Sequence, residues 1–188
     1  MTSTSSQKLY RMVLAALLCA VGIVIPMFMP RITVGPMSFT LASHVAIFLG
    51  MFISPAVAIA VCMGTTLGFF FTAPFIIALR AASHIIFATI GAFILQKNPD
   101  IIRRPASSAL FNFGLAAIHG LAEAVIVTPL FLHGSMAANL TDLGFFTAVV
   151  LLVGVGTMVH SMVDYSISIV LWKPLQSVLR PATQQIAQ

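Results

Sequence analysis

Three pairs of ionisable side chains share one spacing inside long apolar stretches of the sequence. The two members of each pair lie four residues apart, so they share one face of a helix. A charge at the centre of a membrane span costs roughly 2.5–3.5 kcal/mol on insertion scales, so each group needs a partner, a cavity or a ligand. Together with a lone histidine they form the candidate site: Arg80 and His84, His119 and Glu123, His160 and Asp164, and His44.

Arg80 is the strongest candidate for ligand contact. No acidic residue lies four positions away from it, and a guanidinium keeps its charge at any physiological pH. It therefore needs an anion, either Glu123 or a ligand carboxylate. The two histidine–carboxylate pairs have a second interpretation, because a histidine and an acid on one helix face can satisfy each other and only stabilise packing.

The composition places these residues in a membrane. Of the 188 residues, 60% are hydrophobic and 7% are charged, and the mean hydropathy is +1.08. A core of this length cannot enclose so much apolar surface, so lipid must cover the excess. We expect an all-α polytopic membrane protein with one domain over residues 1–188. Windows of about 19 residues, enough to cross roughly 30 Å of hydrocarbon, give six spans near 12–29, 38–53, 55–72, 74–95, 108–132 and 144–172.

The basic residues predict the orientation. Six spans place both termini on one side, together with seven of the nine Lys and Arg residues. Basic residues accumulate on cytoplasmic loops, so both termini are expected in the cytoplasm. Arg80 and His44 then lie in the outer half of the membrane, which predicts an outward-facing pocket. The seven basic residues are Lys8, Arg11, Lys97, Arg103, Arg104, Lys173 and Arg180.

Several function classes lack their sequence signatures. There is no G-x-S-x-G nucleophile motif, no HExxH zinc motif and no G-x-x-x-x-G-K-[ST] phosphate loop, so neither an intramembrane hydrolase nor an ATPase is indicated. His119-x-x-x-Glu123 alone is a weak metal signature, and neither Cys19 nor Cys62 has a His or Cys at ligand spacing. No metal site and no bound cofactor is expected. The scattered basic residues form no platform for nucleic acid.

The first span carries small residues at helix-contact spacing. Such small-xxx-small patterns let helices approach closely in lipid. The pattern predicts either an interface with a partner or packing within the chain. The residues are Ala15, Ala16, Cys19 and Ala20.

Longer stretches carry a family resemblance. They run from Ser38-Phe-Thr-Leu-Ala-Ser-His44 on to Phe52-Ile-Ser-Pro55, then Leu79-Arg80-Ala-Ala-Ser-His84, and Val153-Gly-Val-Gly-Thr-Met-Val-His160 with Asp164. With Ala16-x-x-x-Ala20 in the first span, the chain resembles the substrate-binding S components of energy-coupling factor (ECF) vitamin transporters over essentially its whole length. It is most similar to the niacin-type S components.

The resemblance implies a mechanism, partners and a ligand. An S component captures a vitamin in an outward pocket capped by its first loop, and docks through the small residues of span one on a transmembrane coupling subunit that carries two ATPases. ATP is used by those partner subunits, and toppling of the S component in the membrane delivers the vitamin. Niacin suits the residues, because Arg80 can pair with its carboxylate and a histidine can bond or stack on its ring. The expected contacts are Arg80, His84, His44, His119, Glu123 and His160, with Phe39 and Thr40 from the lid side.

Three alternatives stay open. The chain can be an S component for another vitamin, such as cobalamin, folate or pantothenate, although a corrinoid needs a much larger pocket. It can be a stand-alone proton-coupled carrier that uses the two histidine–carboxylate pairs as a relay. It can also be a purely structural membrane subunit, which predicts no ligand and leaves Arg80 paired with Glu123 alone.

Overall fold

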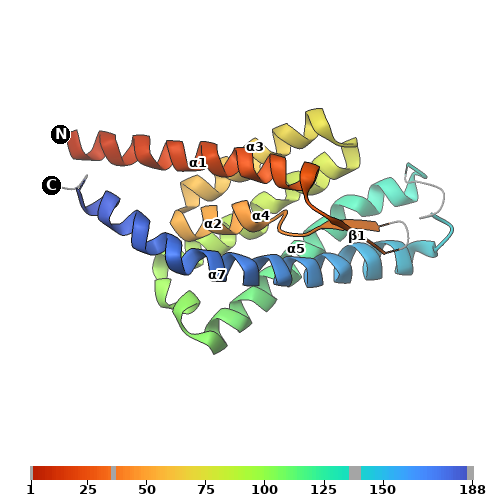
Figure 1. Ribbon diagram of the computed structural model, residues 1–188. Helices are drawn as coiled ribbons and strands as arrows, with labels where there is room; N and C mark the ends of the chain where they lie inside the picture. Colours follow the sequence, from red (N-terminus) through yellow and green to blue (C-terminus); the bar gives the residue numbers. More distant parts are fainter. Residues whose placement is uncertain (1, 35–36, 136–140, 186–188) are drawn as a thin grey trace.

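The computed structural model describes residues 2–34, 37–135 and 141–185, which form a helical bundle with a β-hairpin at one end (Figure 1). The strands pair antiparallel, with Arg31 opposite Thr40. The beginning of α1 and the end of α7 lie at the same end of the bundle, and the hairpin lies toward the other. The elements are α1 (Thr2–Phe28), β1 (Arg31–Val34), β2 (Met37–Thr40), α2 (Val45–Ile53), α3 (Pro55–Thr72), α4 (Phe75–Lys97), the 3₁₀-helix η1 (Pro99–Arg103), α5 (Pro105–Leu132), the π-helix η2 (Phe146–Val155) and α7 (Gly156–Gln185).

Five helical segments in the described part of the chain are long and apolar enough to cross a membrane. They correspond to the expected spans one, three, four, five and six. The prediction of a largely helical, multi-pass membrane protein is therefore confirmed. The segments are Ser5–Phe28, Pro55–Thr72, Phe75–Lys97, Pro105–Leu132 and Phe146–Ser177.

The expected second span at 38–53 is wrong as a continuous helix. Its first residues belong to β2, and α2 has only nine residues, a rise of roughly 13 Å. Ala42 explains the break, because it has a φ of 66°, outside the right-handed helical region. Its backbone N–H donates to Oδ1 of Asp164 on α7 at 2.8 Å. A long-range contact thus fixes this turn, and a short hairpin accompanies the otherwise helical fold.

The short links between spans follow the predicted proline pattern. Ser54 caps α3, its Oγ accepting a hydrogen bond from the backbone N–H of Val57 at 3.3 Å, and Pro55 occupies the first turn, where its missing N–H costs nothing. Pro74 stands directly before α4. The tight connections place α3 beside α2 and α4.

The small residues of α1 divide between two faces. Ala15 is buried, and the Cys19 sulfur packs so closely on Gly64 of α3 that a Cβ at position 64 would collide with it. Ala16 and Ala20 are exposed. Ala15 and Cys19 therefore serve packing within the chain, and an interface with a partner, which stays a prediction, is narrowed to Ala16 and Ala20.

Gly120 lets α5 pack closely against the last span, and Gly120→Ala is expected to destabilise the protein. A Cβ there would collide with the backbone carbonyl oxygen of Gly154 and lie 2.8 Å from Cγ of Met158. Overpacking of this kind costs about 1–3 kcal/mol, which thermal unfolding in detergent measures. Gly114→Ala on the same helix is the control, because a Cβ at Gly114 meets nothing within 4 Å. Equal melting temperatures for the two variants would contradict this packing role.

Candidate functional site

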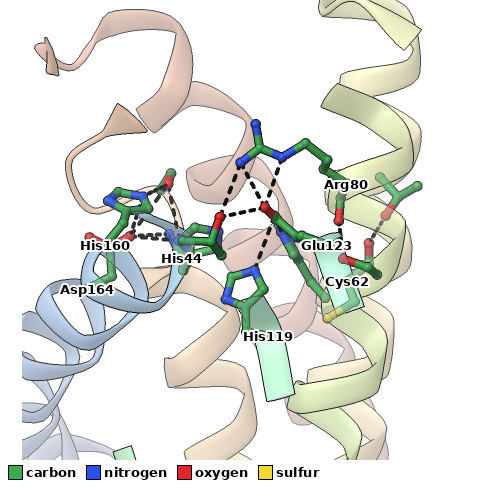
Figure 2. A network of polar contacts seen from close by, with 12 residues as sticks. His44, Cys62, Arg80, His119, Glu123, His160 and Asp164 are labelled. Carbon is green, nitrogen blue, oxygen red and sulfur yellow. Dashed lines mark hydrogen bonds and ion pairs between the residues drawn. The ribbon is translucent and has the colours of Figure 1, made fainter. Parts of the chain in front are cut away.

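The ionisable residues predicted from the sequence converge at one buried centre (Figure 2). Each i, i+4 pair lies on the inward face of its helix, and the lone histidine stands at the start of α2. Four segments that are distant in sequence thus supply one cluster. Its members are His44 before α2, Arg80 and His84 on α4, His119 and Glu123 on α5, and His160 and Asp164 on α7.

Glu123 is the centre of the cluster and is 2% exposed. Its Oε2 accepts hydrogen bonds from Nε of Arg80 at 2.9 Å and from Oγ1 of Thr157 at 2.7 Å, and Nη2 of Arg80 lies 2.8 Å from the same oxygen. Its Oε1 lies 3.3 Å from Nε2 of both His84 and His119. The sequence predicted either Glu123 or a ligand carboxylate as the partner of Arg80, and Glu123 is the partner within the protein.

Asp164 anchors the turn that carries His44. Its carboxylate accepts hydrogen bonds from the backbone N–H groups of Ala42 at 2.8 Å and His44 at 2.9 Å. Nδ1 of His44 lies 3.0 Å from Oδ2 and donates to it, because a carboxylate can only accept. Nε2 of His160, the expected partner four residues away, lies 3.4 Å from Oδ2 of Asp164. Asp164 therefore positions His44 as well as pairing with His160.

The imidazole rings pack against one another around His44. Its ring centroid lies 4.7 Å from that of His84, 4.8 Å from His119 and 4.9 Å from His160, always edge to face. His44 thus joins the Glu123 group to the Asp164 group, a link that its isolated position in the sequence did not indicate.

A cavity of about 320 Å³ opens beside the cluster. Seven of the eight predicted contact residues line the cavity. The eighth, His119, does not line it and is fully buried. Phe39 of β2 packs its ring 5.4 Å from that of His160, so the hairpin borders the cavity; its role as a lid stays a prediction. The predicted residues that line the cavity are Phe39, Thr40, His44, Arg80, His84, Glu123 and His160.

Two hydroxyl residues of the site escaped prediction. Thr157 holds Glu123 and is 1% exposed, and Ser43 places its Oγ 3.0 Å from Nε2 of His160. Both are uncharged, and a serine or threonine in an apolar helix usually bonds its own backbone. Their positions in the sequence could have indicated them, because Thr157 precedes His160 by three residues and Ser43 adjoins His44.

Asp164→Asn is expected to destabilise the protein and loosen His44. An amide presents one N–H₂ group to partners that are themselves donors, and buried donors left without acceptors cost about 1–3 kcal/mol each. Thermal unfolding in detergent checks this prediction. Asp142→Asn, which changes an exposed aspartate between α5 and η2, is the matched control and should melt like the wild type. If Asp164→Asn also melts like the wild type, the anchoring role is wrong.

Comparison with known proteins yields one informative relative. The chain is 39% identical over 171 residues, 90% of its own length and 76% of the relative's, to the niacin transporter NiaX of Lactococcus lactis subsp. cremoris (strain MG1363). No family model matches the chain, and no solved structure matches it. The aligned region includes most of the chain, so it extends well beyond any single motif.

Proposed function

The chain belongs to the family of the niacin transporter NiaX, as its resemblance to niacin-type S components predicted, and from this premise we propose that it is the niacin-binding subunit of an ECF transporter. It captures the vitamin from outside in the cavity beside Arg80. A coupling subunit and two ATPases then supply the energy for delivery to the cytoplasm.

The position of Arg80 is the observation that carries this proposal. Its guanidinium lines the cavity, its side chain is 14% exposed, and Nε and Nη2 make its contacts with Glu123 and Thr157. Nη1 has no hydrogen bond to the described residues and points away from Glu123 (Figure 2). A carboxylate that enters the cavity meets a fixed cation there, and charge-assisted hydrogen bonds of this kind are among the strongest in proteins.

The rest of the cavity suits a small aromatic acid. A volume of about 320 Å³ is near the lower end of the roughly 300–1,000 Å³ typical of small-molecule pockets, which favours a single-ring vitamin over a corrinoid or folate. The ring of His84, whose Nδ1 has no hydrogen-bond partner within the described residues, supplies a polar edge for a pyridine nitrogen, and Phe39 supplies an aromatic face.

The proposed orientation places both termini in the cytoplasm and the hairpin outside, where it covers the cavity. In this arrangement the hairpin and α2 together take the place of the expected second span. The exposed Ala16 and Ala20 of α1 face the coupling subunit. The charge distribution of the loops supports this orientation.

Reconstitution into liposomes tests the transport mechanism. Labelled nicotinate is expected to accumulate only when the coupling subunit, both ATPases and ATP are present. Accumulation by the lone chain under a proton gradient supports instead a carrier in which His44 connects the two carboxylates. If nicotinate accumulates under neither condition, the proposal is wrong.

A further inference from the structure

Four potential metal ligands meet at the buried centre of the site. They come from three separate segments, and one ligand atom of each lies within 4.8 Å of the others. All four residues are buried, and His44 is the most exposed of them at 7%. The residues are His44, His84, His119 and Glu123.

The spacing within this cluster is close to that of a metal shell. Nε2 of His84 and Nε2 of His119 each lie 3.3 Å from Oε1 of Glu123. Two ligands of a tetrahedral zinc ion with bonds of about 2.0 Å are separated by about 3.3 Å. The three imidazole centroids are 4.7, 4.8 and 4.8 Å apart, so the rings surround one point. The four ligand atoms lie within 4.8 Å of one another, so an ion has to draw them closer to complete the shell.

Three ring nitrogens of His84 and His119 have no hydrogen-bond partner within the described residues. His119 is 0% exposed, and neither of its ring nitrogens makes a hydrogen bond within the described residues; Nε2 is close to Glu123 but poorly aligned with it. Nδ1 of His84 is also without a hydrogen-bond partner there. Burying a polar atom without a partner is costly. A metal ion bonded to Nε2 of His119 removes part of that cost.

Neighbouring groups already orient two of the ligands. Arg80 and Thr157 both hold Oε2 of Glu123, which leaves Oε1 facing the histidines. Asp164 holds Nδ1 of His44, which leaves Nε2 for coordination. Metal-binding histidines almost always donate their second nitrogen to a carboxylate or carbonyl, and metal-binding carboxylates are themselves hydrogen-bonded.

We propose that His44, His84, His119 and Glu123 bind one divalent transition-metal ion, for which Zn²⁺ is the best match. Three imidazoles and one carboxylate are the donors that zinc prefers among the divalent ions. The site goes beyond vitamin capture and does not depend on the identity of the vitamin. The sequence prediction of no metal site considered spacing along single segments, and of the four proposed ligands only His119 and Glu123 lie near each other in the sequence.

Metal analysis of the full chain tests the proposal. The protein is purified in detergent, freed of any histidine tag, incubated with Zn²⁺ alone, desalted and analysed by mass spectrometry. The wild type is expected to retain about one zinc per chain, and His119→Gln to lose it. His133→Gln, which makes the same change in the exposed outer loop, is the control and should retain it. Size-exclusion profiles and melting temperatures establish that each variant is folded.

A second measurement needs no variant. Co²⁺ added to the metal-free wild type should give the visible absorption of a four-coordinate ion, which Zn²⁺ then displaces. The proposal is overturned if the wild type retains no zinc and gives no such spectrum. It is also overturned if folded His119→Gln retains as much zinc as the wild type. Nicotinate binding is measured separately, so either proposal can fail without the other.

Discussion

The double variant Arg80→Gln/Glu123→Gln is expected to bind nicotinate about 100-fold more weakly than the wild type. The charge-assisted hydrogen bonds that it loses are worth about 1.5–3 kcal/mol, and each 1.4 kcal/mol changes the affinity about tenfold. Changing both residues matters, because Arg80→Gln alone leaves Glu123 buried without its cation. Breaking a buried pair on one side costs about 3–5 kcal/mol, enough to confuse a binding defect with unfolding. Equilibrium binding of labelled nicotinate in detergent measures the effect.

Glu123→Gln alone is the matched control. The charge it leaves unpaired belongs to Arg80, whose side chain is 14% exposed and lines the cavity, whereas Arg80→Gln leaves the buried Glu123 unpaired. It removes the internal anion and leaves Arg80 charged, so the vitamin carboxylate becomes the best available partner for the guanidinium. Nicotinate should therefore still bind, and should raise the melting temperature of this variant more than that of the wild type. If the double variant binds as tightly as Glu123→Gln, Arg80 does not contact the ligand.

Nicotinamide adds a comparison that changes the ligand instead of the protein. It has the ring of nicotinate but no charge, so the wild type should bind it about tenfold more weakly or worse. The double variant should treat the two ligands almost alike. If the double variant still prefers nicotinate to nicotinamide, the nicotinate carboxylate does not contact Arg80.

Bulky residues on the exposed face of α1 are expected to abolish uptake and leave binding intact. Ala16→Trp/Ala20→Trp places two large rings where the proposed coupling subunit must approach closely. Both positions are exposed, whereas Cys19 of the same helix packs on α3, so the fold should tolerate the change. Nicotinate binding in detergent should match the wild type, and ATP-dependent uptake in liposomes should fall to background.

Val21→Trp is the matched control for this face. Val21 is 43% exposed and lies five positions from Ala16, which points it about 140° around the helix. It should keep its uptake. Equal loss of uptake in both variants would show that α1 is sensitive to bulk in general, and the proposed interface would then be wrong.

The sequence predicted helix faces better than it predicted connections between helices. The i, i+4 pairs were sufficient to place Arg80, His119 and Asp164 toward the interior, because a helix repeats nearly every four residues. Hydropathy was sufficient for five spans. It failed at 38–53, where an apolar composition hid a strand and a turn.

That failure has a physical cause in one long-range contact. The turn at Ala42 depends on Asp164, which lies 122 positions away in the sequence, and no local propensity reports such a partner. The same limit applied to His44, whose neighbours on α4, α5 and α7 are set by packing. Residues whose roles arise between helices therefore required the structure.

The anchoring of residues 42–44 by Asp164 also makes the hairpin and α7 mechanically dependent on each other. Phe39 borders the cavity only three residues before Ala42, so a ligand that draws Phe39 inward pulls, through this turn, on α7. Linkage is reciprocal: if such binding shifts α7, then a partner or a membrane deformation that shifts α7 changes the affinity for the ligand by the same factor. One carboxylate therefore joins the turn beside the cavity to the last helix.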